Sequence, residues 1–136
     1  MRLSTKSQYA CLALIDLAEH PDDGYVKGDD IARRKEIPRR FLEQILLILK
    51  RSRHVKSKKG PDGGYVLARP PKQISLAEII RLIDGAFAPV DSASVYFYEP
   101  TPAERSESLM EVLRGIRNHI SHTLEHTTFA DLVGKR

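Results

Sequence analysis

The 136-residue chain carries its strongest pattern in RRKEIPRRFLEQILLILKRSRHVKSKK, residues 33–59. This segment holds eleven lysines or arginines and only two acids, Glu36 and Glu43, so its net charge is +9. Because the whole chain is +4, all other residues together sum to −5. Positive charge this concentrated favours a polyanionic partner, and phosphate backbones release condensed counterions when they meet it. The segment therefore predicts a surface for nucleic acid.

The apolar spacing within and just before this segment predicts two short helices. The first can be capped by Asp29 or Asp30 and ends near Lys35. Pro38 then suits the first turn of a second helix, which runs to about Arg51. The second helix presents an apolar stripe of Phe41, Leu42, Ile45, Leu46 and Leu49. Two short helices joined by a tight turn predict a helix-turn-helix over about residues 28–51.

A basic hairpin is expected directly after the second helix. The segment His54–Lys58 alternates in the manner of a strand, and Tyr65–Ala68 reads as the returning strand. Between them, GPDGG (60–64) contains the residues that tight turns require. A hairpin in this position predicts a wing over about residues 54–68.

Helices are also expected on both sides of this region. Residues 5–19 can form one that Ser4 or Thr5 caps, and Ser75 can cap another over residues 76–84. The following residues, 87–102, contain prolines and the aromatic run VYFY. This loop is longer than most connections, which favours a functional role, and we interpret it as a possible sensor region.

A long amphipathic helix is predicted over residues 103–127, followed by a tail of residues 128–136. Its apolar stripe consists of Leu109, Leu113, Ile116, Ile120 and Leu124. Such a helix at the end of a small winged-helix domain favours a homodimer seam. The alternative is that the stripe packs on its own domain.

Four segments carry a resemblance to a known family. They are MRLSTKSQYA (1–10), FLEQIL (41–46), KKGPDGGYVLAR (58–69) and ISLAEIIRLIDG (74–85). They resemble the Rrf-two family of winged-helix transcription regulators over most of residues 1–86, and TFADLV (128–133) does so more weakly. The resemblance implies a mainly α fold with a small β-hairpin wing, and a DNA-binding domain over residues 1–86. It also implies a homodimer with crossed long helices that places recognition helices in major grooves and wings in the minor groove.

One departure from the family concerns iron. Cluster-binding members carry three cysteines between the fourth helix and the long helix, whereas residues 85–110 contain none here, and Glu107 lies near the place of the last. Thiolates are the ligands that hold iron–sulfur clusters. A dimer would supply two thiols, both from Cys11. We therefore expect no iron–sulfur cluster and no other cofactor.

Twelve residues are candidates for DNA contact. Arg39, Arg40, Glu43 and Gln44 begin the second helix of the motif, where side chains meet base edges. Lys58, Lys59, Gly60 and Pro61 form the wing tip, which would enter the minor groove. Lys50, Arg51, Arg53 and Lys56 would contact phosphates. For Glu43 the alternative is an ion pair with Arg39 or Arg40 in the same helix, and for each lysine it is a solvated surface position.

Three features compete as sensors of a signal. Cys11 would be a redox switch if Lys6 or a partner subunit lowered its pKa, but buried inert cysteines are commoner. The aromatic segment 95–100 can line a small-molecule pocket or simply cover the domain. His119, His122 and His126 lie on one side of the long helix, where imidazoles can bind zinc, yet that side faces solvent.

Composition restricts the remaining function classes. No apolar run approaches the ~20 residues of a membrane span, and the first residues lack the apolar region of a signal peptide. We therefore expect a cytoplasmic protein with no membrane partner. No Gly-rich phosphate loop, nucleophile elbow or HExxH motif occurs, so an enzyme is not expected.

The sequence thus predicts a homodimeric transcription regulator that represses by binding a palindromic operator in double-stranded DNA. A small-molecule effector or a protein partner would regulate this protein. The alternative is an interaction adaptor, whose winged-helix domain engages a metabolic enzyme or another acidic protein. Steep salt dependence of binding distinguishes the two, because only the DNA reading requires it.

Overall fold

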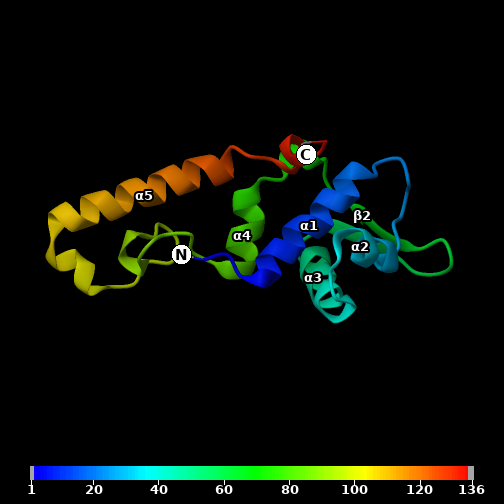
Figure 1. Ribbon diagram of the computed structural model, residues 1–136, viewed down its shortest axis with the longest axis horizontal. Coiled ribbons are helices and arrows are strands. Elements are labelled where there is room, and N and C mark those ends of the chain that lie inside the picture. Colours follow the sequence, from blue (N-terminus) through cyan, green and yellow to red (C-terminus); the bar gives the residue numbers. More distant parts are fainter. Residues whose placement is uncertain (1, 135–136) are drawn as a thin grey trace.

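The computed structural model describes residues 2–134 as a mainly helical fold with one β-hairpin (Figure 1). The helices are α1 (Thr5–Glu19), α2 (Gly28–Lys35), α3 (Arg39–Arg51), α4 (Leu76–Asp84), α5 (Glu107–Glu125) and α6 (Phe129–Leu132). The strands are β1 (Val55–Lys58) and β2 (Gly64–Leu67), and short 3-10 turns cover Pro71–Gln73, Asp91–Ala93 and Pro102–Arg105. The hairpin and the start of α5 lie at opposite ends of the long axis. The predicted fold class is confirmed.

The core lies where α1, α2, α3, α4 and α6 meet. Its fully enclosed side chains include Leu14, Ile31, Leu42, Ile45, Leu46, Leu49, Ile79 and Phe129. Four of these come from α3, whose opposite face is exposed. Apolar residues at this spacing bury one side of a helix and leave the other side free, so α3 is held firmly while it presents side chains outward.

Two helix starts differ from the expectation. The side chain of neither Asp29 nor Asp30 caps α2, since Lys27 is the N-cap residue and both aspartates lie in the first turn. The long helix begins at Glu107 rather than at residue 103, because the Ser106 side chain accepts a hydrogen bond from the Leu109 amide. A serine cap of this kind satisfies an amide that the helix itself leaves unpaired. Residues before it form the 3-10 turn instead.

The turn between α2 and α3 uses a left-handed residue. Glu36 has φ 52° and ends α2, and the amide of Ile37 then donates to the Ala32 carbonyl at 2.9 Å. Ile37 is buried, so it fastens the turn to the core. This geometry fixes the angle at which α3 leaves α2.

The hairpin is joined to the rest of the domain by a third segment. Strands β1 and β2 are antiparallel, with Val55 opposite Leu67 and Lys58 opposite Gly64. Val26 pairs with Tyr65 through two backbone hydrogen bonds of 2.8 Å. Gly64 has φ 150°, and a Cβ there would lie 2.3 Å from the Val26 carbonyl oxygen. Glycine is therefore required where these backbones approach closely.

The C-terminal segment is fastened back onto the domain. The Leu76 amide donates to the Thr127 carbonyl at 2.9 Å, and the Phe129 amide donates to the Ile74 carbonyl at 3.0 Å. Thr128 caps α6 through a capping box with Asp131. The end of α5 is thus tied to the start of α4, and α6 packs against α1 and the 3-10 turn Pro71–Gln73, beside the C label in Figure 1.

Within residues 2–134, no helix combines the length and apolarity that crossing a membrane requires.

Candidate nucleic-acid interface

Four cations of the basic segment are neutralised by carboxylates of the same chain. Arg34 makes two hydrogen bonds of 2.8 and 2.9 Å with Asp16, which is fully buried on α1. Lys35 pairs with Glu19 at 2.7 Å, and Arg33 pairs with Asp30 at 3.1 Å. The fourth is Arg39, which lies 3.1 Å from Asp29 and 3.4 Å from Glu43. Arg34 and Lys35 hold α2 against α1 and are partly buried, whereas the pair of Arg33 and Asp30 lies on the surface of α2.

The other seven cations of the segment have no carboxylate partner among the described residues. They are Arg40, Lys50, Arg51, Arg53, Lys56, Lys58 and Lys59, and all seven are exposed. They come from the outward face of α3, the residues after it and the hairpin. The uncompensated charge therefore lies on one continuous part of the chain, as a phosphate-binding surface requires.

The exposed face of α3 brings together four side chains at helical spacing. Arg40, Gln44, Leu47 and Arg51 recur every three or four residues and are exposed. Glu43 lies beside this row and binds Arg39 at 3.4 Å, the intrahelical pair that was its alternative role. Leu47 is 47% exposed and was not among the sequence candidates, because only charged and polar side chains of this helix were considered for DNA contact. Apolar side chains in this position can contact thymine methyl groups.

The wing tip is braced by a residue that sequence reasoning missed. The Lys27 ammonium donates to the backbone carbonyls of Pro61 and Gly60. Gly60 has φ 101°, a conformation that favours glycine. Lys58 extends over the ring of Tyr25 at 5.7 Å from its centroid. The segment before α2 therefore supports the tip and leaves Lys59 free to point outward.

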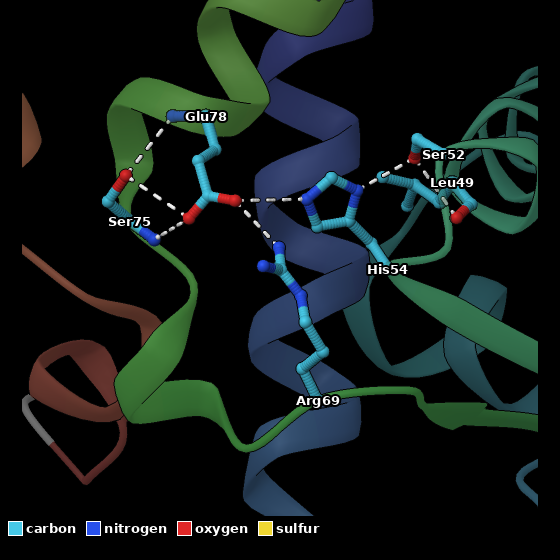
Figure 2. Close-up of polar contacts among 6 residues, drawn as sticks. All are labelled: Leu49, Ser52, His54, Arg69, Ser75 and Glu78. Carbon is cyan, nitrogen blue, oxygen red and sulfur yellow. Dashed lines mark hydrogen bonds and ion pairs between the residues drawn. The ribbon is translucent and has the colours of Figure 1, made fainter.

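A partly buried polar cluster joins α3, the hairpin and α4, as Figure 2 shows. His54 lies just before β1 and is 7% exposed. Its Nδ1 lies 2.7 Å from Ser52 Oγ, and its Nε2 lies 3.4 Å from Glu78 Oε1. Arg69 donates to the same Glu78 oxygen at 2.6 Å, and the Ser75 amide donates to the other at 2.9 Å. Glu78 thus connects the base of the wing to the start of α4.

Burial lowers the pKa of His54 below its ordinary value, although the hydrogen bond with Glu78 opposes that shift. For Glu78, burial would raise the pKa, but hydrogen bonds from Arg69, Ser75 and His54 outweigh it and hold the pKa below its ordinary value. The cluster at neutral pH therefore contains a neutral imidazole and a carboxylate paired with Arg69.

The depressed pKa of His54 predicts a pH-dependent stability. The contribution of His54 to folding stability is fully present above a pH of about 6.5, the ordinary pKa of a histidine in an unfolded chain. Below that pH the unfolded chain takes up a proton more readily than the folded chain does. Stability should therefore fall as pH drops below 6.5 toward the lower folded pKa. Urea unfolding at pH 8 and pH 5.5 measures this, with His54→Gln as the comparison. An equal pH dependence in both proteins would contradict the assignment; the Glu78 contribution is lost only at lower pH, below its ordinary pKa.

The cysteine hypothesis receives no support from its surroundings. Burial, followed by the charge of Asp84, raises the pKa of Cys11 to about 11. Redox-active thiols require the opposite shift, since the thiolate is the reactive form. The condition for a redox switch, a pKa lowered by Lys6, is therefore not met within the single chain.

The histidines of α5 lie where the sequence placed them. His122 and His126 stack with ring centroids 4.2 Å apart, and His126 Nδ1 lies 2.8 Å from the His122 carbonyl oxygen. His119 is exposed on the same helix. Across residues 2–134, no group of three or more histidine, cysteine, aspartate or glutamate side chains is arranged to hold a metal ion.

The apolar stripe of α5 divides into two parts. Ile120 and Leu124 pack against Ala77, Ile80 and Phe87 of their own chain. Leu109 and Ile116 are 46% and 44% exposed, Leu113 is partly buried, and Val112 beside them is 61% exposed. The C-terminal half of the stripe thus belongs to the domain, and the N-terminal half is uncovered.

Comparison with known proteins agrees with this geometry. The model of the Rrf2 family, described as "Iron-dependent Transcriptional regulator", matches residues 3–135. Rv1287 of Mycobacterium tuberculosis, named as an HTH-type transcriptional regulator, is 40% identical over 137 residues, which cover 98% of this chain and 82% of the relative. IscR of Yersinia pseudotuberculosis is 32% identical over 136 residues, which cover 100% of this chain and 81% of the relative.

A solved structure is similar over nearly the whole fold. The global cysteine regulator CymR of Bacillus subtilis matches with a TM-score of 0.77 and 32% identity, over 97% of this chain and 95% of that one. The names of these proteins describe regulators rather than enzymes, as the sequence predicted. This chain belongs to the Rrf2 family of winged-helix transcription regulators.

Proposed function

We propose that the chain is a homodimeric repressor that binds a palindromic operator through α3 and the hairpin. The observation that carries the proposal is the division of the basic segment. Four of its cations are neutralised by carboxylates of the same chain, whereas its seven unpaired cations lie on α3, the residues after it and the hairpin. Such a regulator acts in the cytoplasm, where chromosomal DNA lies.

The contacts divide by type. Arg40 can pair with guanine and Gln44 with adenine in the major groove, and Leu47 lies between them and Arg51 on the exposed face of α3. Lys50, Arg51, Arg53 and Lys56 would bind phosphates, which sets affinity and orientation rather than sequence. Lys58 and Lys59, with Gly60 and Pro61, would reach the minor groove.

The salt dependence of binding tests this proposal. A palindromic site selected from random-sequence duplex DNA would be titrated at several salt concentrations by fluorescence anisotropy. Replacing Lys58 and Lys59 by alanine should reduce the slope of log affinity against log salt by about 0.9 for each phosphate that the variant no longer neutralises. Discrimination between sites should change little in comparison. A flat salt dependence in the unmodified protein, with binding to an acidic protein instead, would favour the adaptor.

We infer that the uncovered part of α5 is the dimer contact. Leu109, Val112 and Ile116 form an exposed apolar row on a helix that projects away from the domain (Figure 1). Exposed apolar rows of this kind on a projecting helix mark protein interfaces. A second copy related by two-fold symmetry would present the same row, and would place two α3 helices on one face.

Replacing Ile116 by aspartate should weaken the dimer about 100-fold, because an unpaired carboxylate buried in an interface costs several kcal/mol. The monomer should keep its stability, since Ile116 is 44% exposed within one chain. Sedimentation equilibrium measures the dissociation constant. Asn118→Asp adds the same charge to an exposed position on the other side of α5 and is the control. Equal dimer strength in both variants would contradict the assigned contact.

The iron of the family description does not fit the residues present. A cluster requires thiolate ligands, and the single thiol of this chain is Cys11, whose pKa is raised to about 11 by burial and by Asp84. The connection between α4 and α5 contains no cysteine. We therefore propose that this member regulates DNA binding without an iron–sulfur cluster.

A further inference from the structure

A cavity lies between α4, the loop that follows it and α5. Its volume is about 30 Å³, which is room for a group the size of a carboxylate, so the rest of a larger ligand would lie at its mouth. Its lining includes Arg81, Phe87, Tyr96, Phe97, Arg117 and Ser121. No acidic side chain belongs to this lining, whereas two guanidinium groups do. The lining is therefore partly aromatic and carries two guanidinium groups, of which Arg81 is paired with Glu125 outside the lining.

One of the two arginines is held in a fixed orientation. The Arg81 guanidinium lies over the Phe87 ring at 4.8 Å and over the Tyr96 ring at 4.5 Å from their centroids. Its Nη2 also donates to Glu125 Oε1 at 3.0 Å. Aromatic rings on a guanidinium restrict its plane while leaving other N–H groups available at the edge. Arg81 is thus a preorganised cation in the wall of the cavity.

The other arginine lacks a partner. Arg117 makes no ion pair with any described residue, and its Nε is buried without a hydrogen-bond acceptor. A buried donor left unpaired destabilises a protein, and it does so more strongly when the group is charged. Ser121 follows it by one turn of α5 and lines the same cavity. Arg117 therefore has no negatively charged hydrogen-bond acceptor among the described residues.

We propose that the cavity binds a small organic carboxylate, with its anionic group held by Arg117 and Arg81. Guanidinium groups bind carboxylates through paired N–H donors, and such bonds are stronger than neutral ones. The apolar part of the ligand would lie against Phe87, Tyr96 and Phe97. The neutral alternative, a water molecule, would satisfy Nε but would leave the charge of Arg117 uncompensated.

The position of the cavity connects it to the DNA-binding surface. Arg81 follows Glu78 by three residues on α4, and Glu78 bonds Arg69 and His54 at the base of the wing. An occupant that shifts α4 against α5 would move this cluster. The effect of the ligand on DNA binding rests on the proposed function, whereas the binding of the carboxylate itself does not.

Binding is tested on the full chain with acetate and benzoate as probes, and acetamide and benzamide as neutral matches. Isothermal titration should give saturable binding of a carboxylate, one per protomer, and none of the amides. Arg117→Gln should weaken it by about 10- to 100-fold, since a charged hydrogen bond is lost. Arg114→Gln removes the same charge three residues earlier on α5, where the side chain pairs with Glu107, and should leave binding unchanged.

Several outcomes would overturn the site. Binding of neither carboxylate, or an equal loss in the two arginine variants, removes the basis of the proposal. Failure of both probes combined with a weaker dimer in Arg117→Gln would assign Arg117 to a carboxylate of the second protomer instead.

The regulatory role has its own readout. Affinity for the selected DNA site should change with the bound carboxylate in the unmodified protein and not in Arg117→Gln, at matched ionic strength. Carboxylate binding without any change in DNA affinity would overturn the effector role alone. Carboxylate binding by a protein that binds no DNA would overturn the proposed function and leave the site intact.

Discussion

Replacing Arg40 and Gln44 together by alanine is expected to lower affinity for the selected operator by about 3 kcal/mol, or roughly 150-fold. Both side chains lie on the exposed face of α3, and neither carries a carboxylate partner or packs in the core. Their removal should therefore leave folding intact and act on DNA alone. Competition binding against operator variants measures the loss, and the preference at the contacted base pairs should disappear with it.

A matched control removes the same kinds of side chain elsewhere. Arg105 and Gln73 are exposed and lie outside α3 and the hairpin, so their double replacement by alanine changes the charge equally. Operator affinity in this control should stay within about threefold of the unmodified protein. If the two double variants lose affinity to the same extent, the contribution of α3 is only its charge, and the assigned base contacts are wrong.

Replacing Phe129 by alanine is expected to reduce the free energy of unfolding by about 3–5 kcal/mol. The ring is fully buried in the main core although it belongs to the last short helix of the chain. Single domains are stabilised by only about 5–15 kcal/mol, so the variant should approach the limit of folding. Urea denaturation followed by circular dichroism measures the change.

Phe97→Ala is the matched control, because it removes the same type of side chain from a position in the loop before α5 that is 44% exposed. It should cost about 1 kcal/mol, in proportion to the smaller area that it buries. Comparable losses from the two phenylalanine replacements would mean that α6 is not part of the folded core. The connection between the end of α5 and the start of α4 would then contribute little to stability.

The helices were located well from the sequence because capping and apolar periodicity depend on residues that are close together in the chain. Ser75 caps α4 as expected, and of the two candidates for α1, Ser4 and Thr5, Ser4 is the cap. The hairpin strands lie within one residue of their expected positions. The long helix was expected from residue 103, whereas Ser106 caps α5 and residues 102–105 form a separate 3-10 turn.

The net charge of residues 33–59 predicted a nucleic-acid surface, but it did not show which cations belong to that surface. Arg34 belongs to the basic segment, yet Asp16, eighteen residues earlier, neutralises it in the core. Lys27 lies outside the segment, yet it braces the wing tip. Both partnerships join residues that are distant in sequence, and no periodicity carries that information. The same limit hid Arg117, whose significance depends on the loop and on α4.

The raised pKa of Cys11 makes this thiol an internal reporter of conformational opening. Burial and Asp84 raise its pKa to about 11, so far less of it is in the reactive thiolate form than in an unfolded cysteine with an ordinary pKa. Alkylation by iodoacetamide should therefore proceed mainly through transiently opened molecules. Since Asp84 at the end of α4 is part of the environment that raises this pKa, the alkylation rate reads out how firmly α1 and α4 are held together, with a single natural label per protomer.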